Sequence, residues 1–127
     1  MTSIQDTPTV TVNPSSRVIK AQFVLGPTVD DFGRDVEQVV QIYVSHNKDR
    51  RYFFGRLSTF TRGHDNGFVI ESHDLFGGPQ VQAPTVRVDR YSAKALQSYF
   101  DATLAYFRSD EVADQVAEVF AVELVSA

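Results

Sequence analysis

The chain of 127 residues contains no cysteine and no tryptophan. Without cysteine it cannot form a disulfide, a zinc–thiolate site or an iron–sulfur cluster, and it has no thiol nucleophile. Long hydrophobic runs are also lacking: no segment approaches the roughly 18 consecutive apolar residues of a membrane-spanning helix. We therefore expect no cofactor, no metal and no membrane partner.

The first residues and the net charge exclude further classes of protein. Residues 1–6 contain neither a basic stretch nor an apolar one, so they do not resemble a secretory signal. The formal net charge of −4 argues against a protein coated in nucleic acid, and a hydrophobic share of 43% is typical of a folded domain. These features predict a cytoplasmic protein with one domain over residues 17–127, preceded by a polar arm or edge strand over residues 1–16.

Alternation of apolar and polar residues predicts an antiparallel meander in the first part of the chain. Gly26-Pro27 should end one strand, and the polar residues 46–49 should form a turn. Asn66-Gly67 favours a tight hairpin turn, because both residues tolerate positive φ angles. The expected strands cover residues 10–12, 17–25, 36–46, 50–61, 68–75 and 85–89.

The periodicity changes near residue 92, from which apolar residues recur at intervals of three and four. This pattern predicts an amphipathic helix with Ser92 as its N-cap, and a second such helix from Ser109, with Leu124 on its apolar stripe. Strands come first and helices last, so the fold class is α+β. We expect a sheet of about four to six strands with both helices packed on one face.

The first helix should complete the core. Phe100 and Leu104 are four residues apart and so share one stripe of this helix. We expect them to cover the most uniformly aliphatic strand face, which carries Val40, Ile42 and Val44.

Basic residues gather in one short part of the chain. Residues 48–62 hold five basic residues against one acidic residue, whereas residues 91–127 hold two against six. If residues 50–61 form a strand, alternation places arginine and aromatic side chains together on one of its faces. Arginine and tyrosine are favoured anchors of protein interfaces. The predicted partner-binding residues are Arg50, Arg51, Tyr52, Phe54, Arg56, Phe60 and Arg62.

The same stripe has two other interpretations. Single-stranded nucleic acid requires rings that stack on bases and guanidiniums that meet phosphates. Alternatively, Tyr52, Phe54 and Phe60 belong to the core, and Arg56 reaches the edge of the sheet. The choice depends on which face of this strand the helices cover.

Histidine and carboxylate residues near the next turn raise the question of a metal site. His64 and Asp65 lie in the turn, and Glu71 and His73 share a strand face, but no recognised ligand spacing is present. Residues 72–74 read Ser-His-Asp, yet alternation directs the histidine away from both neighbours, so they cannot assemble a catalytic triad locally. We expect surface or hydrogen-bonded histidines and no catalytic residue.

Small size, no catalytic motif and a divided charge distribution favour a non-enzymatic binding protein. Inhibitor, immunity and accessory proteins of bacteria and their mobile elements share this profile. We expect a protein partner held by the sheet face and the basic hairpin. The first alternative is a single-stranded nucleic-acid-binding protein that uses the strand at residues 50–62. The second is a small-ligand carrier or enzyme with a pocket between sheet and helices. Ten phenylalanines and five tyrosines, with only two helices to cover the sheet, also favour a homodimer.

Overall fold

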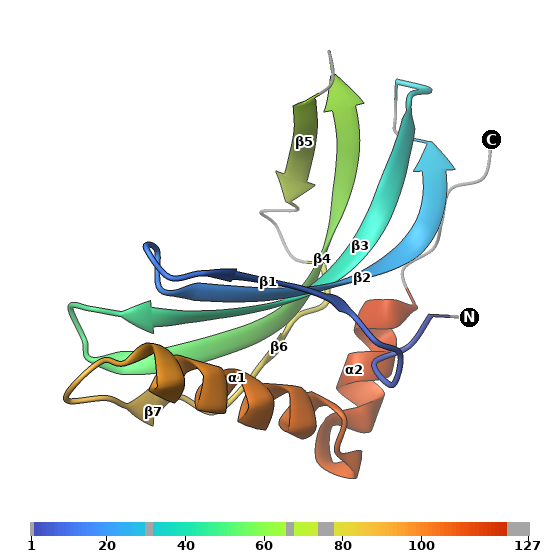
Figure 1. The fold of residues 1–127 in the computed structure, drawn as a ribbon. Coiled ribbons are helices and arrows are strands. Elements are labelled where there is room, and N and C mark those ends of the chain that lie inside the picture. Colours follow the sequence, from blue (N-terminus) through green and yellow to red (C-terminus); the bar gives the residue numbers. More distant parts are fainter. Residues whose placement is uncertain (1, 30–31, 66–67, 74–77, 122–127) are drawn as a thin grey trace.

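An antiparallel sheet occupies the first part of the chain, and two α-helices follow it (Figure 1). The computed structural model describes residues 2–29, 32–65, 68–73 and 78–121. The sheet order is β1-β2-β3-β4-β5, and β6 and β7 both pair with β4. This confirms the expected α+β class. The elements are β1 (Thr9–Asn13), β2 (Val18–Val29), β3 (Asp35–Asn47), β4 (Tyr52–Asp65), β5 (Phe68–His73), β6 (Val81–Gln82), β7 (Val86–Arg87), α1 (Ala93–Phe107), the 3-10 turn η1 (Asp110–Val112) and α2 (Ala113–Phe120).

Strand β4 pairs along both of its edges. One edge lies against β3. The other edge is shared by three pieces of chain: β7 at residues 52–53, β6 at residues 56–57 and β5 at residues 60–65. β6 was not expected, and the strand expected at residues 85–89 is only Val86–Arg87. Both pieces become strands only by pairing with β4, and alternation over two residues cannot reveal such a long-range contact.

Strand β2 continues through Gly26-Pro27, so the expected end at these residues is wrong. The pairing with β3 shifts between Val24 and Gly26, which marks a β-bulge, and Gly26 has a φ of 127° that glycine adopts readily. β1 pairs only with residues 18–22 of β2, so Pro27 lies where that edge of β2 is not covered by β1. Proline is tolerated on an edge because no ladder hydrogen bond is lost there.

The β3–β4 turn lies at residues 48–51, two residues later than predicted. Asn47 sets its position, because Asn47 Oδ1 accepts hydrogen bonds from the backbone N–H groups of Asp49 (3.1 Å) and Arg50 (3.0 Å). Arg50 and Arg51 therefore belong to the turn, and β4 begins at Tyr52 rather than at residue 50.

The β4–β5 hairpin agrees better with the sequence. Asp65 pairs with Phe68, so the two strands flank Asn66-Gly67 as a two-residue connection would require. β5 ends at His73, and the expected continuation to residue 75 lies outside the described residues.

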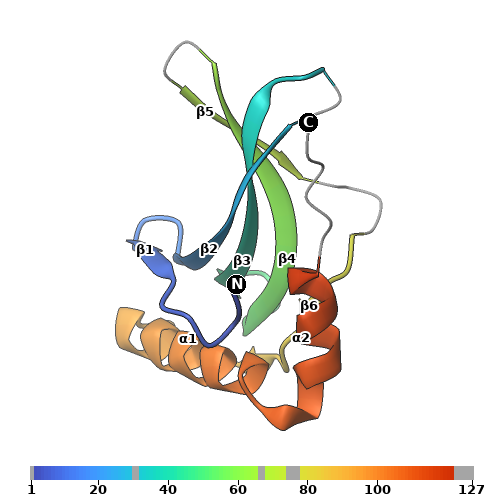
Figure 2. The same ribbon diagram turned by 90° about the vertical axis from the view of Figure 1, so that its right-hand side faces the viewer.

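Ser92 is the N-cap of α1, as predicted: its Oγ accepts a hydrogen bond of 3.0 Å from the backbone N–H of Ala95. The second helical segment follows Ser109 but opens as η1, so α2 itself starts at Ala113. Leu124 lies outside the described residues. Both helices lie beside the lower part of the sheet, and the upper parts of β2 to β5 extend beyond them (Figures 1 and 2). None of the helices described is both long and apolar enough to cross a membrane.

The main core lies between the helices and the inner face of the sheet. Phe100 is 3% exposed and belongs to one hydrophobic cluster with three fully buried residues of β3, and Leu104 packs against that cluster. The predicted packing of α1 is thus confirmed. The inner face carries Val40, Ile42 and Val44 of β3, Ile19, Ala21 and Phe23 of β2, and Phe53 and Leu57 of β4.

We predict that Phe100→Ala lowers the free energy of unfolding by about 3–5 kcal/mol, because it leaves a cavity in this core. Urea denaturation followed by circular dichroism measures the loss. Arg56→Ala is the control: this side chain is exposed, and its removal should change stability by less than about 0.5 kcal/mol. A neutral Phe100→Ala together with a strongly destabilised Arg56→Ala would mean that core and surface are exchanged.

Helix α1 lies close to β4 at Gly55. A Cβ atom added to Gly55 would lie 3.0 Å from Thr103 Cγ2, 3.3 Å from Thr103 Oγ1 and 3.3 Å from Val44 Cγ2. These distances are shorter than most Cβ contacts in proteins, so a side chain at residue 55 would require Thr103 or Val44 to move by a few tenths of an ångström.

We predict that Gly55→Ala destabilises the protein by about 1–3 kcal/mol through this overlap. Thr103→Ala removes the two nearest atoms, so the double variant should recover part of the loss. Denaturation of the two single variants, the double variant and the wild type gives the coupling energy. Additive losses, with no recovery in the double variant, would show that the close approach of α1 is not what excludes a side chain at residue 55.

Candidate binding surface

The two faces of β4 have different neighbours. Phe53, Gly55 and Leu57 are buried on the inner face, toward the helices. Tyr52 and Phe54 are half-buried and Arg56 is exposed, and alternation places all three on the opposite face. The helices therefore cover the other side of the strand. Of the three residues that the core interpretation named, Phe60 is buried, whereas Tyr52 and Phe54 are half-buried and lie outside the core cluster.

Three half-buried aromatic rings lie together on this outer face, opposite the helices. The ring centroid of Phe54 is 6.0 Å from that of Tyr43 on β3 and 6.2 Å from that of Tyr52. The Tyr52 hydroxyl accepts a hydrogen bond of 3.4 Å from Asn47 Nδ2, which helps to hold the ring in place. We call Tyr43, Tyr52 and Phe54 the aromatic strip.

Basic side chains flank the aromatic strip. Tyr43 is paired across the sheet with Lys20 on one side and Arg56 on the other, and the Arg56 guanidinium carbon is 5.6 Å from the Tyr43 ring centroid. Tyr52 is paired with Arg87 of β7. These cross-strand partners of the rings supply positive charge and no carboxylate. Contact area and positive charge are therefore what this surface can offer a partner.

Two of the predicted binding residues, Phe60 and Arg62, are engaged within the fold. Phe60 is 2% exposed, and so is not part of the exposed surface. Arg62 donates to Glu37 Oε2 from Nε (3.2 Å) and from a terminal nitrogen (2.8 Å), and its other terminal nitrogen donates to Gln22 Oε1 (3.0 Å). Arg62 is thus committed to holding β2, β3 and β4 together. Tyr52, Phe54 and Arg56 lie together on the outer face, and Arg50 and Arg51 lie at the adjacent turn.

Sequence reasoning missed Lys20, Tyr43 and Arg87 as members of this surface. Alternation within residues 36–46 does separate Tyr43 from the aliphatic face, so this residue could have been found. Lys20 and Arg87 come from distant segments, and only the strand register places them beside the rings.

For the histidine and carboxylate residues considered for a metal, the structure describes the backbone but not the side chains. These residues are His64, Asp65, Glu71 and His73. Within the described part of the chain, no three histidine or carboxylate side chains are grouped as a metal ion would require.

His46 at the end of β3 is half-buried among aromatic rings. It stacks on Tyr91 with a centroid distance of 5.1 Å and meets Phe53 edge-on at 5.4 Å. Arg17 NH1 lies 3.0 Å from His46 Nδ1; because a guanidinium only donates, Nδ1 must accept and the neutral ring carries its proton on Nε2. Nε2 is buried and has no partner among the described residues. Burial lowers the pKa of His46, and the charges of Arg17 and Lys48 lower this pKa further.

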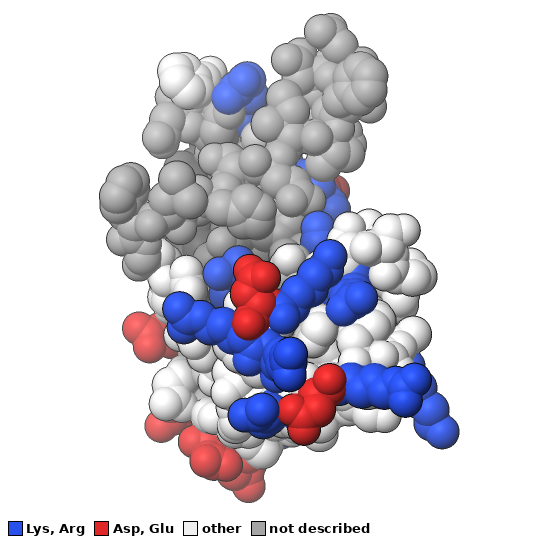
Figure 3. All heavy atoms as spheres, turned by 90° about the vertical axis from the view of Figure 1, so that its left-hand side faces the viewer, with Lys and Arg blue, Asp and Glu red and all other residues white. Residues whose placement is uncertain are grey.

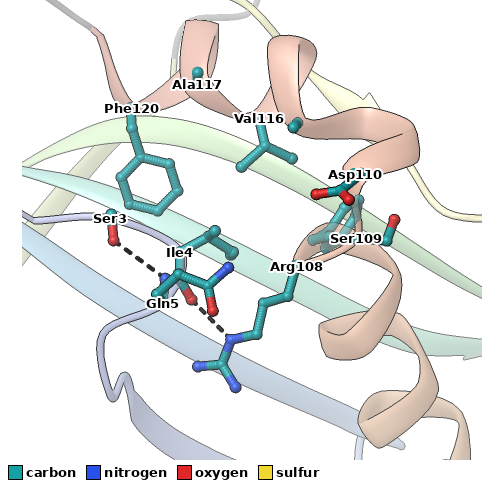
Figure 4. Close-up of a pocket in the computed structure, with 11 residues that line it drawn as sticks. Ser3, Ile4, Gln5, Arg108, Ser109, Asp110, Val116, Ala117 and Phe120 are labelled. Carbon is teal, nitrogen blue, oxygen red and sulfur yellow. Dashed lines mark hydrogen bonds between the residues drawn. The ribbon is translucent and has the colours of Figure 1, made fainter.

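A pocket of about 190 Å³ lies where the N-terminal segment meets the helices (Figure 4). Ile4 points into it between Phe120, Val116 and the stem of Arg108. The Arg108 guanidinium donates to the backbone carbonyls of Ile4 (2.8 Å) and Asp6 (3.0 Å), so its charge holds the N-terminal segment in place. The pocket is lined by this segment and the helical region, not by the sheet as the carrier hypothesis required.

No protein-family model, curated protein or solved structure matches this chain. Its function must therefore be argued from its own residues.

We predict that stability falls as the pH drops below about 6.5, the ordinary pKa of histidine in an unfolded chain. The folded-state pKa of His46 is lowered, so the unfolded state binds the proton first and gains free energy as the pH falls through this range. Urea denaturation near pH 7.5 and near pH 5.5 measures the effect. His46→Gln, whose amide oxygen can still accept from Arg17, should lose less stability between the two pH values. An equal loss in both proteins would show that His46 does not contribute.

Proposed function

We propose that this chain is a non-enzymatic, cytoplasmic binding protein of the inhibitor, immunity or accessory type, which engages a macromolecular partner through the outer face of its sheet. The observation that carries the proposal is the aromatic strip with Arg56, which faces away from the helical layer.

The chemistry of this surface supports binding rather than reaction. Tyrosine and arginine give the largest losses when interface residues are truncated, because each combines apolar area with a polar group. The strip and its basic neighbours contain no carboxylate or imidazole that could serve as a general base. The rings are attached to paired strands, so little conformational freedom is lost when a partner binds.

We predict that replacing Tyr52 and Phe54 together by alanine abolishes capture of the partner from an extract of the native host. Each truncated anchor should weaken binding by about tenfold or more. Phe32→Ala is the matched control, because Phe32 is 83% exposed in the β2–β3 connection at the far end of β3. The expected result is a protein or nucleic acid that is retained by the wild type and by Phe32→Ala, but not by the double variant.

Two measurements complete this experiment. Circular dichroism must show that the double variant is folded. Retention of the same macromolecules by all three proteins, or of none by any, would contradict the proposal. A second copy of the chain is the alternative partner: light scattering would then give twice the monomer mass of 14.2 kDa for the wild type and the monomer mass for the double variant.

A further inference from the structure

Exposed basic side chains from three segments meet at one end of the molecule. The β3–β4 turn contributes three of them, the segment from β7 toward α1 contributes two, and the first turn of α1 contributes one. A backbone hydrogen bond of 2.7 Å from Val88 N–H to the Arg51 carbonyl joins the first two segments, and the stacking of Tyr91 on His46 holds the start of α1 against the end of β3. We call these residues the basic end: Lys48, Arg50, Arg51, Arg87, Arg90 and Lys94.

Few acidic groups offset this charge. The exposed carboxylates within the same segments are Asp49 and Asp89, and Asp89 accepts a hydrogen bond of 3.0 Å from Arg87 in a highly exposed ion pair. Figure 3 views the molecule from the left-hand side of Figure 1. Lysine and arginine side chains gather over the lower half of this view, with two acidic groups between them. A chain of net charge −4 thus carries a strongly positive surface at one end.

Local backbone geometry at this end disfavours the residues found there. Among the described residues other than glycine, those with a left-handed φ are Arg17 and Arg51, both at 55°. Asparagine or glycine adopts this conformation at lower cost. Arg51 lies in the β3–β4 turn, and Arg17 ends the adjacent β1–β2 turn, where its carbonyl accepts from the His46 N–H (3.2 Å).

Lys94 also occupies an unfavourable local position. The first turn of α1 contains no acidic residue, although the helix dipole favours negative charge there and disfavours a cation. The other helical segments follow the rule, with Asp110, Glu111 and Asp114 in their first turns. Residues that cost local stability concentrate at functional sites. Their shared feature here is positive charge.

The basic end and the aromatic strip are continuous. Arg51 immediately precedes Tyr52, and Arg87 is the cross-strand partner of Tyr52. From Tyr52 to Arg56 the strand covers roughly 13 Å at about 3.3 Å per residue, enough for a few nucleotides. Cations that meet a charged backbone, next to rings that stack on unpaired bases, are the combination that single-stranded nucleic acid requires.

We propose that the partner of the outer sheet face is single-stranded nucleic acid, with phosphates on the basic end and bases on the aromatic strip. This inference rests on the proposed function, since it names the partner of the same face. An acidic protein would satisfy the cations, but a single strand needs in addition rings that stack on its unpaired bases.

Fluorescence anisotropy with a labelled single strand of about 20 nucleotides tests the inference, because such a strand exceeds the roughly 4–16 nucleotides that comparable sites cover. We expect binding at low salt that weakens as salt rises, with a slope of log K against log salt of about −0.7 for each phosphate contacted. A duplex of the same sequence and polyglutamate of similar length should compete poorly.

Two variants separate binding from folding. Arg51→Asn suits the left-handed backbone, and Lys94→Glu suits the helix dipole, so both should melt at the wild-type temperature or above it. Each should nonetheless weaken binding severalfold and reduce the salt slope by about 0.7 for each phosphate that the variant no longer neutralises. Arg34→Glu matches the charge reversal of Lys94→Glu, but Arg34 precedes β3 while the basic end follows it, so affinity should be unchanged.

The outcomes distinguish this inference from the proposed function. No binding at tens of micromolar protein, equal binding by all variants, or equal competition by polyglutamate would exclude single-stranded nucleic acid as the partner. If the wild type then captures a protein that the double alanine variant of Tyr52 and Phe54 does not retain, the outer face binds a protein, and only the inference fails. If that variant loses nothing, the proposed function fails as well.

Discussion

The packing of α1 on the inner face of β3 and β4 sets the orientation of every side chain in those strands. Side chains alternate between faces, so burying Val40, Ile42 and Val44 under the helix leaves Tyr43 outside, and burying Phe53 leaves Phe54 outside. A slip of one residue would reverse the two faces. The close contact between Gly55 and Thr103 opposes such a slip, because a larger residue at this point would crowd the helix. The candidate binding surface is thus a consequence of how the core is packed.

At the basic end, positively charged residues stand at positions where they lower the stability of the fold. Arg51 occupies a backbone conformation that costs an arginine roughly 1–2 kcal/mol, and Lys94 opposes a helix dipole worth about 0.3–1 kcal/mol. A small domain has a total stability of only about 5–15 kcal/mol, so these costs are appreciable. The helical segment that follows keeps its acidic residues where the dipole favours them. The contrast suits a molecule of negative net charge that attracts anions at one end.

Arg108 shows the opposite use of a cation. It follows α1 directly, and its guanidinium binds two carbonyls of the N-terminal segment while Ile4 packs into the core. The charge of Arg108 therefore stabilises the fold, as does the charge of Arg62. Nothing in the sequence distinguishes these two arginines from the others. Counting basic residues along the chain cannot separate such structural cations from those that face a partner, because the difference lies in what each side chain contacts.

Local signals in the sequence were sufficient for the long strands and the start of the first helix. Period-two alternation located the long strands, Ser92 marked the start of α1, and Asn66-Gly67 marked the β4–β5 hairpin. These signals are short-range, since they depend on backbone preferences and on which side of one element is apolar. Tertiary structure decided what those elements expose. Because of tertiary contacts, β2 continues past the bulge at Gly26, and β6 and β7 pair with the edge of β4 that faces away from β3. The same contacts bury Phe60 and place Lys20 and Arg87 beside the rings. All of these depend on strand register between residues far apart in the chain, and register is a property of the folded sheet that no single segment contains.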